Sequence, residues 1–536
     1  MTAIHQLHGP LSRHSFEGVP PDAIHPHPAT GCLPRYTFHG DHGELSRRLE
    51  SIERRLQAQG IECVSLSFDD LAAVLRPDMT AAVTCFVESS RPAAGPTSFL
   101  ESSTALFGEL MRHEIWVSIR SDTDPERRLE VVRTLDTQLC PFSEAEISEL
   151  GPLNPRVSEL VDHYQRAGVA VDNVNLFVKD HLLLEKVNLL SALFNLGFEP
   201  RKTVVISKAD KTFYRNRVFY HLRARGVTVL ESDTALHDLP LVSDCQPGEA
   251  TVIVDDGADL IRSVLARAPR RRLIAIETTA KGMRVLRSTG LADQVVNLSD
   301  TPVKYHMSRS IAASCVHRFR ELLRHAPLAD ERCIVVGYGR LGRHVSELLR
   351  GCGMDVTVAE VDSQARESAL QAGFPVADSI EQAADPTIGY LFGCSGVQSV
   401  GVHAVQRLSP TSVLCALSSQ DLVRAIRGMR EIAEVSPVRG VGTRYKFGGR
   451  TVTVLADGHA VNLHYAEGVN EPDFDAFTAL IGVAVVESAR YLLGDCPLPT
   501  SDEMCAIAAA STSYERESSL LHNPVQTTGE PVGGGE

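Results

Sequence analysis

The sequence predicts a protein of the α/β class, and two observations carry that prediction. Short apolar runs alternate with amphipathic helical patterns over most of the chain, which is typical of βαβ units and parallel sheets. In addition, a glycine-rich turn at residues 337–342 separates an apolar run from a helical pattern. The 536 residues are enough for three or four domains at about 150 residues each.

Charge and composition narrow the functional classes. The net charge is −14 and no basic patch is evident, which disfavours nucleic-acid binding; the basic run "RAPRRR" at residues 267–272 fits a solvated turn. The N-terminus has no signal-peptide pattern, and we find no apolar run that approaches the length of a membrane span. Twelve cysteines without a CxxC pair favour reduced thiols over a zinc site. We expect a cytoplasmic protein without nucleic-acid partners, membrane partners or a bound metal.

Composition shifts divide the chain into segments. The first is rich in Pro, His and Gly and is expected to be a flexible arm, and the last is Gly- and Pro-rich and is expected to be disordered. The second has helical patterns such as "GELSRRLESIERRLQAQG" and strand patterns such as "EIWVSIRS", but no motif that indicates chemistry. The expected boundaries are 1–40 for the arm, 41–145 for this small α/β extension, 146–308 for a larger α/β unit, 309–468 for a third α/β unit, 469–510 for a further helical segment and 511–536 for the tail.

Four apolar runs within residues 146–308 predict a parallel sheet. They are "KTVVISK", "GVTVLES", "TVIVDDG" and "RLIAIETT", and each lies near a helical segment. This spacing is typical of consecutive βαβ units.

A Rossmann-type dinucleotide site is predicted at the glycine-rich turn. Its glycines permit a tight turn and let the backbone approach a pyrophosphate at the helix N-terminus. Glu360 ends the next apolar run, 21 residues after Gly339 (360 − 339), where a carboxylate accepts hydrogen bonds from an adenosine ribose and repels a 2′-phosphate. Val361 and Asp362 follow it, not an arginine, so NAD is favoured over NADP; the alternative is a Rossmann-like fold with an empty site. The turn residues expected at the cofactor are Gly337, Gly339, Arg340, Leu341 and Gly342.

Several further motifs resemble the S-adenosylhomocysteine hydrolase family, in the family's order. They are "HLLLEKVNLLSALFNLG", "VDDGAD", "ETT", "SDTPVK", "VVGYGRLGR", "VTVAEVD" and "RYKFGGRTVTVLADGHAVNL", and the similarity covers roughly residues 160–490. The resemblance implies a Rossmann-type NAD-binding domain inserted late in an α/β substrate domain, to which the chain returns at residues 469–510. It leaves the first 140 residues as an N-terminal α/β extension of unknown role. It also implies a homo-oligomer.

The resemblance implies a mechanism and a set of site residues. In the family, tightly bound NAD oxidises a ribose 3′-hydroxyl to a ketone, a thiol leaves from the 5′ carbon, water adds, and the ketone is reduced again. The matching catalytic residues are Lys304 as the proton acceptor, Glu277 beside the hydroxyl, Asp256 as an acid–base group and His181 on the substrate side. Glu185 matches an adenine-contacting residue, Thr278 and Thr279 match cofactor-contacting threonines, and Asn462 matches the residue that holds the nicotinamide amide.

The chain also departs from the family pattern. A Gly-His-Phe-Asp motif becomes residues 418–421, "SSQD", so its histidine is Ser419; a Gly-His-Pro-Ser motif becomes residues 468–471, "GVNE", so its histidine is Val469. A threonine becomes Leu183, an Asp-Asn pair becomes residues 308–309, "SR", and the family's C-terminal Lys and Tyr have no counterpart. Because a site built on hydrogen bonds rejects strongly when its polar groups are lost, adenosine recognition and the elimination half of the reaction are in doubt.

The residues that match the family and those that depart from it together leave three functional hypotheses. The leading hypothesis is an NAD-dependent enzyme that oxidises a sugar hydroxyl of a nucleoside-like or thioether substrate other than S-adenosylhomocysteine. The alternatives are true S-adenosylhomocysteine hydrolysis and a non-catalytic NAD-binding relative. Lys304 argues against the last, because a protein that only binds does not need that base.

Overall fold

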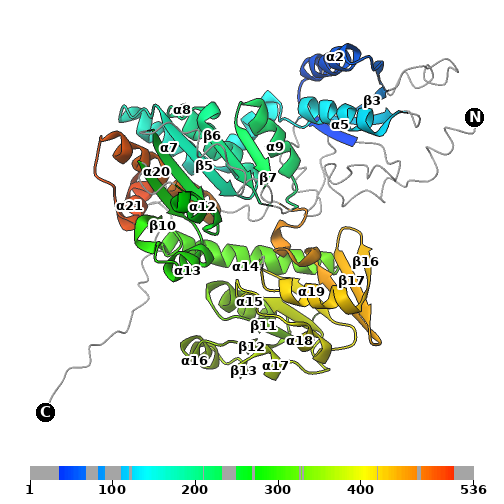
Figure 1. Cartoon of the computed structure of the whole chain (residues 1–536), viewed down its shortest axis with the longest axis vertical. Helices are drawn as coiled ribbons and strands as arrows, with labels where there is room; N and C mark the ends of the chain where they lie inside the picture. The colour runs from blue at the N-terminus through cyan, green and yellow to red at the C-terminus, as the bar shows by residue number, and fades with distance from the viewer. Residues whose placement is uncertain are drawn as a thin grey trace, which may run out of the picture.

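In a computed structural model of the chain, the described residues form three β-sheets joined by helices (Figure 1). The residues that the structure describes are 35–67, 83–90, 110–119, 123–208, 211–231, 249–267, 272–324, 328, 331–418, 420–466 and 472–511. The expected arm up to residue 34, the tail from residue 512, and most of the basic run at 267–272 lie outside them.

The N-terminal unit is a four-stranded sheet of order β1-β4-β3-β2. Its elements are β1 (Arg35–His39), α2 (His42–Ala58), β2 (Cys63–Ser67), β3 (Val83–Ser90), β4 (Arg112–Ile119) and α5 (Pro125–Leu139). Strand β1 corrects the expected flexible arm, because its residues pair antiparallel with β4. Tyr36 and Phe38 alternate along β1 and are buried, so this strand has the period of two that a half-buried strand requires.

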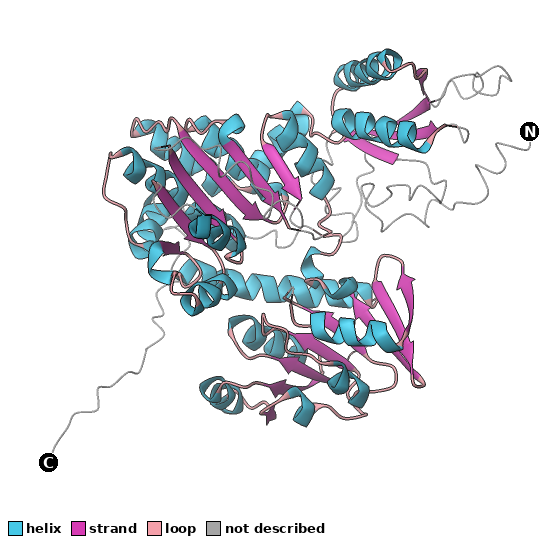
Figure 2. Ribbon diagram, in the orientation of Figure 1, coloured by secondary structure: helices cyan, strands magenta, loops and turns pink. Residues whose placement is uncertain are grey.

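The second sheet has six parallel strands in the order β10-β9-β8-β5-β6-β7, as the four apolar runs predicted. The strands are β5 (Val174–Asp180), β6 (Thr203–Ser207), β7 (Thr228–Glu231), β8 (Ala250–Asp255), β9 (Leu273–Glu277) and β10 (Val295–Asn297). Helices flank it (Figure 2): α6 (Glu144–Leu150), α7 (Pro155–Arg166), α8 (Leu184–Asn195), α9 (Arg215–Ala224), α12 (Asp259–Arg267) and α13 (Ala280–Ser288). The chain runs outward in opposite directions from β5 and β8, so the carboxyl ends of these two strands form a topological switch point, where ligands bind in open α/β sheets.

The third sheet has eight strands in the order β13-β12-β11-β14-β15-β18-β17-β16. Its strands are β11 (Arg332–Val336), β12 (Asp355–Ala359), β13 (Val376–Ala377), β14 (Tyr390–Gly393), β15 (Val413–Ala416), β16 (Glu434–Val438), β17 (Gly442–Phe447) and β18 (Arg450–Leu455). Its helices are α15 (Arg340–Gly351), α16 (Ser363–Gln371), α17 (Ile380–Ala383), α18 (Val402–Arg407) and α19 (Val423–Ile432). The strands from β13 to β18 are parallel and have a Rossmann-type order, which agrees with the predicted fold class, and β16 and β17 add an antiparallel edge.

Helix α14 (Pro302–Leu322) connects the six-stranded and eight-stranded sheets (Figure 1). It packs against α15 on one side and against α20 (Pro472–Leu493) on the other. The boundary expected between residues 308 and 309 therefore falls inside a continuous helix.

Helix α20 corrects the expectation that no apolar run reaches membrane-span length. Residues Phe474–Leu493 have the length and the mean hydropathy, 1.5, of such a span. In this protein, 83% of that window is buried, packed against α7, α8, α14, α21 (Ser501–Ser511) and the strands β8 and β9. Its apolar side chains are therefore accounted for as the core of the six-stranded unit.

Candidate active site

Ionisable side chains gather where four neighbouring strands of the six-stranded sheet end. Glu277 is the last residue of β9, Asp256 follows β8, His181 follows β5 and Lys208 follows β6. Parallel strands end at the same edge of a sheet, so these side chains come together from segments far apart in the sequence. Three of the four, excluding Lys208, were predicted from the sequence.

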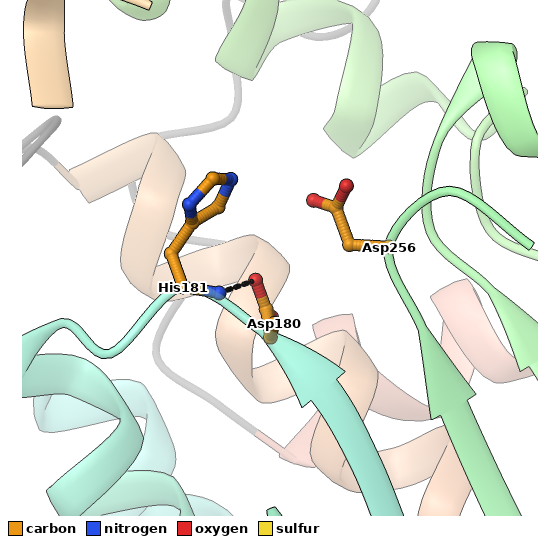
Figure 3. A group of neighbouring side chains, drawn as sticks. All are labelled: Asp180, His181 and Asp256. Carbon is orange, nitrogen blue, oxygen red and sulfur yellow. Dashed lines mark hydrogen bonds between the residues drawn. The ribbon is translucent and has the colours of Figure 1, made fainter. Parts of the chain in front are cut away.

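Asp180, His181 and Asp256 form a compact group at the switch point (Figure 3). The His181 backbone N–H donates to Asp180 Oδ1 at 2.7 Å, and one potential ligand atom of each residue lies within 4.8 Å of the others. Two lysines already contact this group: Lys208 donates to Asp256 Oδ1, and Lys186 Nζ lies 2.7 Å from Asp180 Oδ2. A metal ion would have to displace both ammonium groups, so the arrangement is an ion-pair network.

Glu277 is a buried carboxyl group with an unused oxygen. Its Oε1 accepts hydrogen bonds from Thr279 Oγ1 at 2.6 Å, from the Thr279 backbone N–H at 2.7 Å and from the Gly257 backbone N–H at 3.2 Å. Its Oε2 has no hydrogen-bond partner among the described residues. Burial, followed by the charges of Asp255 and Asp256, raises the pKa of Glu277 to about 8. The group is therefore protonated at neutral pH and has a proton to donate.

Lys304 lies in the first turn of α14 and faces the same group. Its Nζ is 4.1 Å from the centre of the Phe477 ring on α20, a cation–π contact that replaces hydration. Burial lowers the pKa of Lys304 to about 8, although the charges of Asp256, Asp180 and Glu277 oppose that shift. An amine with this pKa is partly neutral near physiological pH and can accept a proton.

Glu185 lies in the first turn of α8, beside Lys186. It is buried, and its Oε1 makes no hydrogen bond, with Lys186 Nζ 3.8 Å away. Burial raises the pKa of Glu185 to about 7. Leu183, where the family has a threonine, immediately precedes α8 and is also buried.

The glycine-rich turn between β11 and α15 has the shape that a pyrophosphate needs. Gly337 has φ of +95°, and a Cβ there would lie 2.8 Å from Ser395 Cα. A Cβ on Gly342 would lie 1.9 Å from the Gly337 carbonyl oxygen, so the turn packs closely against the helix. Gly339, by contrast, faces open space, with no atom within 4 Å of an added Cβ, and precedes α15 without a side-chain cap. The exposed first N–H groups of α15 therefore fit a dinucleotide phosphate.

Glu360 is fixed next to this turn. Its Oε2 accepts from the Tyr338 backbone N–H at 2.6 Å, and its Oε1 accepts from the backbone N–H groups of Val361 and Asp362 at 2.7 and 2.9 Å. The nearby guanidinium of Arg366 donates to the Val361 carbonyl and pairs with Asp378 at 3.2 Å. The guanidinium of Arg366 is thus held by the backbone that follows Glu360 and by Asp378.

The glycine-rich turn also contacts the segment that leads into α14. Arg340 donates to the carbonyl of Ser299 and to Asp300 Oδ1 at 2.7 Å, a few residues before Lys304. Leu341, next in the turn, packs on the apolar core beneath α15. The glycine-rich turn thus contacts the segment that immediately precedes α14, the helix that carries Lys304.

The remaining predicted cofactor residues make contacts within the protein. Thr279 caps α13 by accepting from the Gly282 backbone N–H at 3.0 Å, and Thr278 donates through N and Oγ1 to the Asp255 carbonyl at 3.1 and 3.2 Å. Asn462 is buried in the 3₁₀ helix η8 (Val461–Leu463), where its backbone contacts the Cys315 thiol of α14. Contacts of all three with a cofactor stay predictions, and Ser419 and Val469 lie outside the described residues.

Sequence reasoning missed Lys208, Lys186 and Asp180. The signal that could have found Asp180 and Lys208 is position, since both stand where an apolar parallel strand ends. Asp421 was also missed as an organising group: its carboxylate accepts from Ser395 and Ser399, at 2.5 and 3.3 Å, and also from Ser418.

Comparison with known proteins agrees with the predicted resemblance. Residues 312–468 match the family model "S-adenosyl-L-homocysteine hydrolase, NAD binding domain". Adenosylhomocysteinase of Thermotoga maritima is 27% identical over 346 residues, which are 61% of this chain and 82% of that protein. S-inosyl-L-homocysteine hydrolase of Methanopyrus kandleri is 28% identical over 257 residues, 45% of this chain and 59% of that protein. Among solved structures, dipicolinate synthase A chain from Bacillus subtilis has a TM-score of 0.32 at 10% identity, covering 64% of this chain and 97% of that one.

Proposed function

We propose that this member of the adenosylhomocysteinase family, which carries an NAD-binding domain, oxidises a sugar hydroxyl of a nucleoside-like or thioether substrate other than S-adenosylhomocysteine. The observation that carries the proposal is the position of Lys304 in the first turn of α14, where its Nζ packs on the Phe477 ring and lies near the carboxyl groups of Asp256 and Glu277. A base is needed there because hydride leaves a carbinol carbon only as the hydroxyl proton departs.

The chain's own residues have distinct tasks in this proposal. Gly337, Gly339 and Glu360 would hold NAD, which supplies the hydride acceptor when bound. Lys304 accepts the hydroxyl proton at Nζ. Glu277, protonated at neutral pH, donates a hydrogen bond to a neighbouring substrate oxygen and so orients the sugar.

Two observations support a substrate that differs from S-adenosylhomocysteine. Leu183 is apolar and 3% exposed where the family has a hydroxyl, so one polar contact is lost next to Glu185. The M. kandleri relative is named for S-inosyl-L-homocysteine, so the nucleoside also differs among the proteins that this chain resembles. We further propose a cytoplasmic homo-oligomer, in line with the free thiols of all ten cysteines among the described residues.

Substitution Lys304→Met tests the proposed function. We expect the variant to retain NAD, because the glycine-rich turn is untouched, but to form bound NADH about 100- to 10,000-fold more slowly than wild type on substrate addition. Absorbance of bound NADH in single-turnover mixing with nucleosides and nucleoside thioethers is the measurement. Lys446→Met, an exposed lysine on β17, is the matched control. NADH formation at the wild-type rate in Lys304→Met would overturn the proposal.

S-adenosylhomocysteine hydrolysis is the second candidate, favoured by relatives that are named adenosylhomocysteinase. Homocysteine release at about 10 per second, a usual rate for metabolic enzymes, would establish it over the leading proposal. Absence of NADH with every substrate tried would favour the non-catalytic alternative.

A further inference from the structure

Lys208 occupies the centre of the candidate site, yet neither the family motifs nor the proposed mechanism uses it. It directly follows β6, and its backbone N–H donates to the Asp180 carbonyl at 3.2 Å. Its ammonium donates to Asp256 Oδ1 and lies 3.4 Å from His181 Nε2. Figure 3 shows that His181 and Asp256 come from the ends of the two switch-point strands, so Lys208 bridges both.

The chemistry of these three groups restricts where their protons lie. An ammonium has donors only, so the nitrogen of His181 that faces it has to be an acceptor. In the neutral ring, the proton therefore resides on Nδ1 and leaves Nε2 with its lone pair. Asp256 accepts from the same ammonium, and contact with Lys208 holds the pKa of Asp256 well below its usual range.

The Lys208 side chain keeps its positive charge at this position. Burial disfavours its charge, but Asp256, Asp180 and Asp255 outweigh burial and raise the pKa of Lys208 above its ordinary value. The side chains of Lys208 and Asp256 are 23% and 21% exposed, so a substrate can reach both of them.

We propose that Lys208 is a positioning residue, which fixes the proton of His181 on Nδ1 by occupying the Nε2 lone pair, and which leaves the second oxygen of Asp256 to accept a hydrogen bond from the substrate. Such an acceptor fits a substrate group with a donor, as a sugar hydroxyl has. The catalytic consequence rests on the proposed function, whereas the proton arrangement is a property of the NAD-loaded protein without substrate. A metal ion bound by Asp180, His181 and Asp256 would compete for the same atoms. The Lys208 ammonium contacts two of these three residues instead.

The tautomer of His181 tests the proposal without any turnover. Nitrogen-15 NMR of the NAD-loaded full chain, labelled in its histidine rings, is compared between wild type, Lys208→Met and Lys208→Arg. The His181 signals are identified by their loss in His181→Gln. We expect Nε2 of wild type to have the chemical shift of an unprotonated nitrogen, to lose it in Lys208→Met and to retain it in Lys208→Arg.

Two results would overturn the proposal: a protonated Nε2 in wild type, or an unprotonated Nε2 that is unchanged in Lys208→Met. The wild-type spectrum decides on its own if Lys208→Met does not fold. Lys202→Met, which removes a lysine next to the start of β6, is the control and should leave the His181 signals unchanged. Since no step here requires NADH formation, failure of the proposed function and failure of this inference give separate results.

Discussion

At the scale of single residues, the carboxyl group of Glu277 and the amine of Lys304 have similar pKa values. Burial raises the pKa of Glu277 to about 8 and lowers the pKa of Lys304 to about 8. Near neutral pH the carboxyl group keeps its proton while the amine begins to lose one. Such matched, displaced pKa values are typical of functional sites, because they give an acid and a base in one place.

Glu277 should make the stability of the protein depend on pH. Its folded pKa, about 8, lies above the ordinary 4.5, so between these values the folded state holds a proton that the unfolded state lacks. This stabilisation is fully present below pH 4.5 and is lost as pH rises through about 8. We expect the melting temperature of Glu277→Gln to fall less steeply than that of wild type over this range, measured by calorimetry. Parallel curves would contradict the raised pKa, and exposed Glu367→Gln is the control.

At the scale of elements, the turn between β11 and α15 contains one glycine that the fold requires and one that it does not. Gly342 is required by the fold, since its added Cβ would meet the Gly337 carbonyl at 1.9 Å. Gly339 faces open space and has a negative φ, so the protein itself tolerates a methyl group there.

Gly339→Ala should therefore fold normally and bind NAD weakly. The methyl group would occupy the space in which a pyrophosphate approaches the backbone. Titration calorimetry with NAD and a thermal melt without it would measure the two effects separately. Gly351→Ala, at the other end of α15, also meets no atom within 4 Å and should bind NAD as wild type does. Wild-type affinity in Gly339→Ala would move the cofactor site elsewhere.

The elements differ in how far the sequence reveals them. Strand β11, the turn and Glu360 are local: an apolar run, glycines and an acid at a fixed spacing suffice to predict them. Strand β1 was missed because its alternating Tyr36 and Phe38 stand at the end of a Pro- and His-rich stretch. The contact of Lys208 with Asp256 is non-local, since it depends on β6 and β8 both lying beside β5, an order that no local pattern encodes.

At the scale of the whole molecule, the N-terminal unit lies beside the six-stranded unit (Figure 1), and a buried ion pair attaches the two. Arg217 of α9 donates to both oxygens of Glu146 at 2.8 and 2.7 Å and to the Cys140 carbonyl at 3.0 Å. Glu146 also contacts His39 Nδ1 at 3.0 Å, at the end of β1. One fully buried carboxylate thus links three segments of the chain.

Arg217→Met should destabilise the protein by about 3–5 kcal/mol, because it leaves the Glu146 carboxylate buried without its main cation. Chemical denaturation followed by far-UV circular dichroism is the measurement. Arg217→Met combined with Glu146→Gln should recover part of the loss, and exposed Arg166→Met should change little. A loss below 1 kcal/mol in Arg217→Met would mean that apolar packing alone attaches the N-terminal unit.

Helix α14 fixes the distance between Lys304 and the point where the helix contacts the NAD-binding unit. Lys304, the proposed base, lies in the first turn of this helix, and Cys315, eleven residues further on (315 − 304), contacts the backbone of Asn462 in the NAD-binding unit. At 1.5 Å per residue the helix keeps these two points about 16 Å apart along its axis. The helix therefore sets both the distance and the angle between these two points. One residue inserted between Lys304 and Cys315 would lengthen the distance by about 1.5 Å and rotate the Lys304 amine by about 100°, away from the neighbouring acids.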